Sequence, residues 1–188
     1  MSYKNERLIE FNRFLNGKKV AIIGLGVSNL PLLKYMYDKK ANVTIFDEKD
    51  EEKANQEALT KVKEYRFKTF FGKDSLTNLK GFDIIFRSPS CLPTRPELVI
   101  EEERGAIVTT EIEMLMKLSP AKIIGVTGSD GKTTTTSLIY SILKKAGYNT
   151  YLGGNIGIPL FTKIDEITPE DIIVLELSSF QLMGMEIS

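Results

Sequence analysis

Apolar residues in this chain follow two alternating patterns from about residue 18 onward. One is a short continuous run, which is typical of a buried strand. The other is a spacing of three or four residues, which is typical of a helix. In the first part of the chain the runs predict strands over Lys18–Gly26 (ending in a glycine turn), Asn42–Phe46, Phe67–Phe71, Asp83–Phe86 and Ala106–Val108. The helical spacing predicts helices over Pro31–Asp38, Glu97–Glu103 and Glu111–Leu118, and a solvated helix or long connection over Asp50–Lys63.

The alternation begins again after Ser119-Pro120, which we interpret as a linker. The second series comprises a strand over 121–126, a helix over 132–145, a short segment at Thr150–Leu152 and a strand over Asp171–Leu177. Strands that alternate with helices indicate an α/β fold with parallel sheets. We expect a Rossmann-like parallel-sheet domain over residues 1–118, followed over residues 121–188 by the first part of a P-loop ATPase-type α/β domain. Such a domain normally needs several more strands, so we expect it to be truncated.

The stretch I-I-G-V-T-G-S-D-G-K-T-T-T-T-S-L joins the strand and helix that open the second series. Strand, glycine turn and helix are the layout of a phosphate-binding loop, in which free backbone N–H groups surround an anion. Gly128 and Gly131 can take positive φ angles, Lys132 can reach the β- and γ-phosphates, and the Thr133 hydroxyl can bind Mg²⁺. The strict pattern requires glycine where this chain has Val126. A plain glycine turn with a surface lysine therefore stays open as the alternative.

An earlier glycine turn follows the first predicted strand, in K-K-V-A-I-I-G-L-G. Asp47 ends the second predicted strand about 20 residues further on, where the dinucleotide-binding fingerprint has an acidic residue. Asn29 stands in place of the third glycine of that fingerprint. Two interpretations stay open: a site for a nucleotide diphosphate, or a plain Rossmann-type turn in which Asp47 only forms the strand-end turn.

The strand predicted over Asp83–Phe86 continues into R-S-P-S-C-L-P-T-R-P, whose prolines make a rigid loop. In an open α/β sheet, ligands bind at the carboxyl ends of the strands, which is where this loop lies. Nothing beside Cys91 in this loop suggests an activated thiol, so we interpret that cysteine as incidental.

Composition and charge narrow the classes of function. The formal net charge is +0 at pH 7, so neither nucleic acid nor an anionic membrane is an expected partner. The single cysteine excludes an internal disulfide and fits a reducing cytosol, and the first residues lack the apolar core of a signal peptide. We therefore expect a cytoplasmic protein. Histidine is absent, so no imidazole of this chain acts as a base or binds a metal.

Three stretches, G-V-T-G-S-D-G-K-T-T-T-T, G-G-N-I-G-I-P and V-L-E-L-S-S-F-Q-L, have an order and spacing that resemble the ATP-dependent Mur ligases of bacterial cell-wall synthesis. The resemblance runs from about Lys18 to the last residue. It is strongest to the members that join D-glutamate to UDP-N-acetylmuramoyl-L-alanine. It implies an ADP-forming acid–D-amino-acid ligase of peptidoglycan precursor synthesis that works through an acyl phosphate. It also implies ATP and Mg²⁺ as cofactors, those two small molecules as substrates, and a monomeric full-length enzyme.

The resemblance further implies which residues form the sites. Lys132 and Glu176 are the expected catalytic residues, and Thr133 and Glu176 are the expected Mg²⁺ ligands. The residues expected to bind ATP are Gly128, Ser129, Asp130, Gly131, Lys132, Thr133, Thr134 and Thr135. The residues expected to bind the UDP substrate are Leu25, Gly26, Val27, Asp47, Lys49, Ser90 and Asn155.

Two positions depart from the pattern of the family. Asp130 stands where asparagine is usual, and a carboxylate aimed at a triphosphate is unfavourable. We therefore expect Asp130 to face outward or toward Mg²⁺. Ser90 replaces the glycine of an S-P-G turn that helps to position the uracil nucleotide, which leaves that contact open.

Purely structural interpretations stay open for several of these residues. Glu176 ends an apolar strand, and since a buried unpaired carboxylate is costly, it either binds a metal or pairs with a cation. Asn155 lies between glycines and could serve only as a turn residue with positive φ. Ser178 and Ser179 could cap a helix that begins near Phe180.

Two other functions stay open on the sequence alone. A P-loop kinase or NTPase would use the phosphate loop but leaves the first domain without a task. A non-catalytic module would use residues 1–118 to bind a UDP-sugar or a dinucleotide. The leading prediction is the ligase, with this chain as an N-terminal piece that is inactive alone, because the remaining metal ligands and the acceptor site of the family are expected beyond Ser188.

Overall fold

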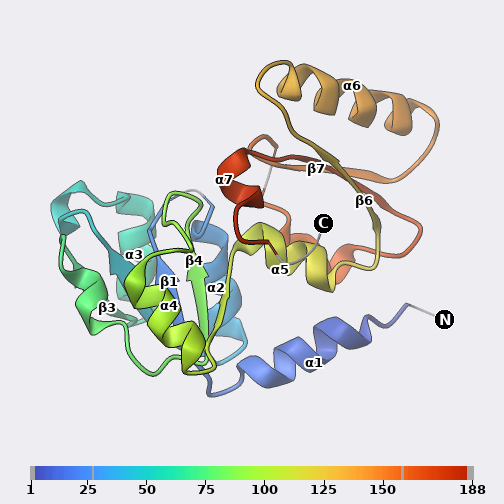
Figure 1. The fold of residues 1–188 in the computed structure, drawn as a ribbon. Coiled ribbons are helices and arrows are strands. Elements are labelled where there is room, and N and C mark those ends of the chain that lie inside the picture. The colour runs from blue at the N-terminus through green and yellow to red at the C-terminus, as the bar shows by residue number, and fades with distance from the viewer. Residues whose placement is uncertain (1–2, 27, 158, 186–188) are drawn as a thin grey trace. The chain divides into compact units, whose positions relative to one another are not determined.

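The computed structural model describes residues 3–26, 28–157 and 159–185. The chain forms two compact units. One unit comprises Ile9–Glu111, and the other comprises Met1–Leu8 together with Ile112–Ser188. Each unit is built around its own parallel sheet, whose strands and helices can be followed in Figure 1.

The first unit contains a five-stranded sheet with the order β3-β2-β1-β4-β5, in which every neighbouring pair is parallel. The strands are β1 (Lys19–Ile23), β2 (Asn42–Asp47), β3 (Lys68–Phe71), β4 (Ile84–Arg87) and β5 (Ile107–Thr109). The connections contain α2 (Leu30–Asp38), η1 (Glu51–Lys53), α3 (Gln56–Glu64), η2 (Ser75–Asn78) and α4 (Pro96–Glu103). A sheet that starts at its middle strand and grows outward in both directions is the Rossmann-type order. The predicted Rossmann-like α/β fold is confirmed.

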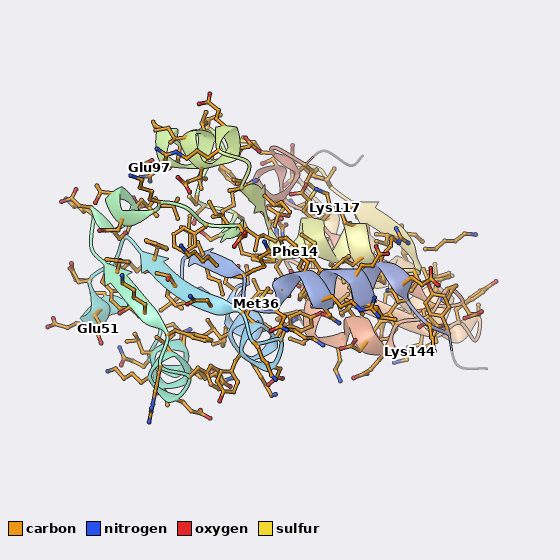
Figure 2. All side chains as sticks on the ribbon, turned by 90° about the horizontal axis from the view of Figure 1, so that it is seen from below. Phe14, Met36, Glu51, Glu97, Lys117 and Lys144 are labelled. Atoms are coloured by element: carbon orange, nitrogen blue, oxygen red, sulfur yellow. The ribbon has the colours of Figure 1, made fainter. Side chains whose placement is uncertain are left out.

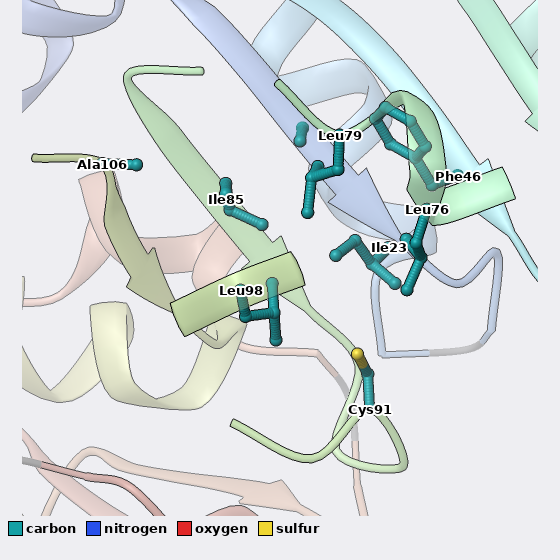
Figure 3. Close-up of a cluster of buried hydrophobic side chains, with 9 residues drawn as sticks. Ile23, Phe46, Leu76, Leu79, Ile85, Cys91, Leu98 and Ala106 are labelled. Carbon is teal, nitrogen blue, oxygen red and sulfur yellow. The ribbon is translucent and has the colours of Figure 1, made fainter. Parts of the chain in front are cut away.

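The central strands of this sheet are buried on both faces, which explains their continuous apolar runs. One face packs Ile23, Phe46 and Ile85 against Leu98 of α4 and Leu76 of η2 (Figure 3). Helix α2 contributes the fully buried Leu32, Leu33 and Met36, the last of which is labelled in Figure 2. This packing holds the strands in register, so the loops that follow them lie along one edge of the sheet.

The second unit contains a three-stranded parallel sheet with the order β6-β8-β7. Its elements are β6 (Lys122–Val126), α6 (Lys132–Lys145), β7 (Thr150–Gly154), η3 (Phe161–Glu166), β8 (Ile172–Glu176) and α7 (Ser179–Leu182). Helix α5 (Glu111–Leu118) begins at the boundary between the units. Helix α6 contacts all three strands, but its Leu138 and Ile142 are each 58% exposed.

The predicted strands and helices are found close to their predicted places, and Asp50–Lys63 resolves into η1 and α3. The pattern missed α1 (Glu6–Leu15), the first helix of the chain. Leu8, Phe11 and Leu15 recur in it at helical spacing, a signal that could have revealed it. None of the helices in the described ranges is both long and apolar enough to cross a membrane.

Candidate functional site

The loop between β6 and α6 is shaped by two glycines with positive φ. Gly131 is the N-cap of α6 with a φ of 72°, and Gly128 has a φ of 147°. Both values lie in a region that favours glycine. Within the described part of the chain, the backbone N–H groups of residues 128–134 donate to no acceptor. A row of free N–H groups at the N-terminus of a 14-residue helix is an anion-binding arrangement.

The Lys132 side chain folds over this loop. Its Nζ donates to the carbonyl oxygen of Gly128 at 2.9 Å and to that of Ser129 at 3.1 Å. The ammonium therefore lies directly above the turn that presents the free N–H groups. It is placed where it can neutralise the charge of a bound phosphate.

Glu176 lies beside the first turn of α6, because β8 is the middle strand of its sheet. The register pairs Glu176 with Val126 on one side and with Gly154 on the other, so three strands end at the same level. The Thr133 hydroxyl donates to Glu176 Oε2 at 2.7 Å, and Glu176 is only 5% exposed. The structure thus brings together two oxygen ligands that are 43 residues apart in sequence.

These two oxygens suit a magnesium ion. Mg²⁺ binds oxygen at about 2.0–2.1 Å in an octahedron, so adjacent ligand oxygens lie about 2.9 Å apart. The separation of 2.7 Å between Thr133 Oγ1 and Glu176 Oε2 is close to that value. Among the described residues, no three histidine, cysteine or acidic side chains gather into a metal site. Water and phosphate oxygens would therefore supply the remaining ligands, which is how Mg²⁺ is usually held beside a nucleotide.

Glycines at the end of β7 let the backbones approach closely. Gly154 has a φ of 91°, and a Cβ atom there would collide with the carbonyl oxygen of Glu176. That carbonyl accepts the N–H of Asn155 at 2.9 Å. The Asn155 side chain is exposed at the same end of the sheet as the phosphate loop. The G-G-N stretch therefore presents an amide beside Glu176, on a turn that only glycine can form without strain.

The other predicted residues of this loop have less specific surroundings. Asp130 is exposed, and no hydrogen bond or ion pair of its side chain is found among the described residues. Thr134 and Thr135 are exposed in the first turn of α6, where the Thr135 N–H donates to the Gly131 carbonyl at 2.9 Å. Ser178 is the N-cap of α7 and forms a capping box with Gln181, as the structural interpretation of that stretch predicts.

In the first unit, Asp47 joins two loops at the carboxyl end of the sheet. Its Oδ2 accepts the N–H of Leu25 at 2.8 Å, its Oδ1 accepts the N–H of Lys49 at 2.9 Å, and its side chain is buried. Asp47 thereby holds the glycine turn after β1 against the turn after β2. Gly26 is exposed beside it, and Val27 lies outside the described residues.

The loop after β4 lies beside the same glycine turn. A Cβ atom on Gly24 would come within 3.0 Å of Ser88 Oγ, so glycine lets this loop approach closely. Ser90 is exposed, and its Oγ lies 3.1 Å from that of Ser88. Cys91 is buried, and burial raises the pKa of its thiol, which disfavours the reactive thiolate. This fits the interpretation of Cys91 as incidental.

Two further residues of this edge were missed by sequence reasoning. Arg95 pairs with Glu48 at 2.8 Å and with Glu97 at 3.4 Å, so it ties the loop after β4 to the turn after β2. The hydrogen bond to Glu48 is the main cause that raises the Arg95 pKa. Asn29, at the base of the glycine turn, donates to the carbonyls of Ile23 and Gly24 at 2.9 and 3.0 Å. Its position in place of a fingerprint glycine was the available signal.

Comparison with known proteins identifies relatives of both units. Residues 18–110 match the Mur ligase MurD-like N-terminal domain, and residues 126–187 match the Mur ligase middle domain. A UDP-N-acetylmuramoylalanine--D-glutamate ligase of Clostridium novyi is 51% identical over 177 residues, and one of Clostridium botulinum is 49% identical over 179 residues. The alignments cover 94% and 95% of this chain but only 38% and 39% of those relatives.

A solved structure is also similar. It is a pseudomurein peptide ligase type C from Methanothermus fervidus, with 24% identity and a TM-score of 0.44. The similarity covers 87% of this chain and 33% of that one.

Proposed function

Because this chain belongs to the Mur ligase family, we propose that it supplies the substrate-binding unit and the ATP loop of a ligase that joins D-glutamate to UDP-N-acetylmuramoyl-L-alanine. The relatives named for this reaction are about half identical to the chain over nearly its whole length. The chain spans less than two fifths of their length, so the proposal concerns its share of the reaction. We expect the reaction to take place in the cytoplasm, because ATP is available there and the reducing conditions keep the single cysteine as a thiol.

One observation carries the proposal. The free N–H groups of residues 128–134, the Lys132 ammonium and the Thr133–Glu176 pair converge on the same turn. Each addresses a different part of a magnesium-bound triphosphate: its phosphate oxygens, its charge and its metal. A plain glycine turn would have no need of a buried carboxylate beside the threonine.

The reaction joins a carboxylate to an amine, and carboxylate oxygen is a poor leaving group. ATP supplies the phosphoryl group that converts the alanyl carboxylate into an acyl phosphate, from which the D-glutamate amine displaces phosphate. The chain contributes position and charge. Lys132 would offset charge on the transferred phosphoryl oxygens, and Thr133 and Glu176 would hold Mg²⁺.

The first unit would hold the UDP end of the substrate at the carboxyl edge of its sheet. Gly26 and the backbone around Lys49 line that edge, and Asp47 holds the two turns together. Binding energy from this remote part of the substrate then orients the reacting carboxylate. In the second unit, the exposed Asn155 beside Glu176 would face the muramoyl part of the substrate.

The direct test is a chimaera in which this chain replaces the matching N-terminal part of the Clostridium novyi ligase. We expect ADP release that requires both UDP-N-acetylmuramoyl-L-alanine and D-glutamate. The chain alone should release no ADP with these substrates. ADP release by the chimaera without D-glutamate would instead indicate an NTPase or kinase.

Ligand titrations of this chain keep the test decisive if the chimaera folds poorly. We expect the chain to bind UDP-N-acetylmuramoyl-L-alanine and to discriminate against NADH. Tight NADH binding without binding of the UDP ligand would overturn the proposal in favour of a dehydrogenase-like module.

A further inference from the structure

The first unit has a second concave surface, at the opposite end of its sheet from the glycine turn. It is a groove of about 680 Å³ along the amino ends of β2 and β3 and the C-terminal ends of α2 and α3. A volume in this range is typical of small-molecule sites. Six of the ten residues that line the groove are aromatic or cationic, namely Tyr37, Tyr65, Phe67, Lys40, Arg66 and Lys68.

The aromatic side chains form a cluster of one stacked pair and one tilted ring. The Tyr37 and Tyr65 rings are stacked, with centroids 4.4 Å apart and an angle of 20° between their planes. The Phe67 ring centroid lies 5.5 Å from that of Tyr65, with an angle of 54° between the planes, so this ring extends the cluster toward β3 at a tilt. Tyr37 is 51% exposed, so this ring is accessible to a ligand. Aromatic faces of this kind bind flat rings by stacking.

The charge of the groove is positive. Its one acidic residue, Asp38, is paired with Lys34 at 2.6 Å. Across the described ranges, no carboxylate pairs with Lys40, Arg66 or Lys68. These cations are therefore available to an anion, although the ammonium of Lys68 also lies 4.9 Å from the centre of the Phe70 ring.

The backbone of the groove is strained at two of these cations. Lys40 and Arg66, with φ angles of 58° and 57°, are the non-glycine residues with positive φ in the described chain. Each follows the last turn of its helix, where the N–H of the next residue bonds back to the helix, from Ala41 to Met36 and from Phe67 to Val62. Glycine is the usual residue at this place, because other side chains are strained there.

Two other helices of the same chain have glycine at this position and are not strained there. Helices α4 and α6 end in the same hydrogen-bond pattern, with Gly105 and Gly147 at the corresponding place. Favourable interaction with the helix dipole does not explain the difference, since α6 carries Lys144 and Lys145 within its last turn and still has glycine after it. The cations at Lys40 and Arg66 are thus kept in spite of their effect on the backbone. Strain of this kind concentrates at functional sites.

We propose that this groove binds a nucleoside monophosphate, with its base stacked on Tyr37 and its phosphate between Lys40 and Arg66. A ring joined to a phosphate matches the aromatic surface and the two cations at once, whereas a simple anion or an apolar molecule matches only one of them. The site is independent of the proposed ligase reaction, since it lies at the other end of the sheet.

The experiment is a titration of the isotopically labelled chain with AMP and UMP, followed by amide NMR shifts. We expect saturable shifts at residues 37–43 and 64–68, distinct from any shifts at the glycine turn or the phosphate loop. The double variant Lys40→Gly/Arg66→Gly should bind at least tenfold more weakly. Its Tm should stay equal or rise, because glycine relieves the strained φ angles. Lys39→Ala, which removes a neighbouring cation outside this groove, is the matched control and should bind normally.

Three results would overturn the proposal. The first is the absence of shifts at these residues. The second is equal binding of inorganic phosphate alone, or binding only of a single-stranded oligonucleotide, because the groove would then not recognise a free nucleotide. The third is a lower Tm in the double variant with unchanged affinity, which would give the two cations a structural role.

Discussion

Asp47 and Glu176 end parallel strands in the two units and are almost equally buried, at 8% and 5% exposure. Their oxygens are nevertheless used differently. Both oxygens of Asp47 accept backbone N–H groups, from Leu25 and Lys49. Glu176 accepts one side-chain hydroxyl, from Thr133, at Oε2. Both oxygens of Asp47 are thus used to hold the loops of its own unit. Glu176 can still accept further hydrogen bonds or bind a metal, and it lies beside a turn with free N–H groups.

This difference separates a carboxylate that builds a site from one that takes part in its chemistry. A buried carboxylate is costly unless its oxygens are paired. Asp47 meets this requirement within the fold, so its removal should destabilise the first unit. Glu176 meets it only in part, so its removal should weaken metal and nucleotide binding and leave folding largely intact.

The largest effect should follow from Lys132→Ala. Lys132 belongs to the phosphate loop beside Glu176, so this variant tests whether the chemistry takes place in the second unit. Loss of the ammonium removes charge stabilisation at the phosphoryl group, so ADP release by the chimaera should fall about 10²–10³-fold. Binding of the UDP substrate, measured by calorimetry, should be unchanged because Asp47 and its loops are untouched. Loss of both ADP release and UDP-substrate binding would contradict the proposal that Glu176 takes part in the chemistry while Asp47 holds the substrate-binding loops.

The next effect is that of Glu176→Gln. The amide oxygen can still accept the Thr133 hydroxyl, but the side chain is neutral and binds Mg²⁺ poorly. Mg²⁺-dependent ATP affinity should fall about 10–100-fold in titrations at several Mg²⁺ concentrations. The urea midpoint is the control and should change little. An unchanged Mg²⁺ dependence would contradict the metal role of Glu176.

Asp47→Asn should have the opposite profile. Asparagine has one acceptor oxygen, so one of the N–H groups of Leu25 and Lys49 faces an amide donor. An unsatisfied buried donor costs about 1–3 kcal/mol of unfolding free energy. Urea unfolding measures this loss, and ATP affinity at the other unit is the control. A variant of wild-type stability with weaker UDP binding would show that Asp47 contacts the ligand directly.

The smallest effect concerns Asp83, a partly exposed carboxylate just before β4. The Lys18 ammonium bonds to it at 2.9 Å, which is the main cause that holds the Asp83 pKa below its usual value of 3.8. A lowered carboxyl pKa stabilises the fold above the usual pKa, and this contribution is lost as pH falls through the folded-state pKa. Between about pH 5 and pH 3, Asp83→Asn should therefore lose slightly less stability than the wild type in urea unfolding. An identical pH profile would show that the pair contributes nothing.

The sequence was sufficient for elements whose signal is local. Gly128, Gly131, Lys132 and Thr133 are contiguous, so their pattern predicts the loop and its positive φ angles directly. The parallel sheets follow from the alternation of strands and helices. That alternation does not predict the order of the strands. The order matters for the site, because the central position of β8 in its sheet brings Glu176 to Thr133.

Contacts between distant loops lay beyond the sequence. The pairing of Arg95 with Glu48 joins residues 47 positions apart and depends on how two loops approach at the sheet edge. The commitment of both Asp47 oxygens depends in the same way on the path of the turn at Leu25. Side-chain type predicts that such groups find partners, but only the geometry of the loops decides which ones.

The carbonyls of Gly128 and Ser129 accept two hydrogen bonds from Lys132, so they compete with an incoming anion for its ammonium. An incoming anion must displace these carbonyls, so the affinity that is measured is that of an exchange rather than of a simple association. Chloride, with one diffuse charge, gains little from such an exchange, whereas the terminal oxygens of a polyphosphate gain much more. The loop should for this reason select its ligand by charge density and bind a polyphosphate much more strongly than chloride.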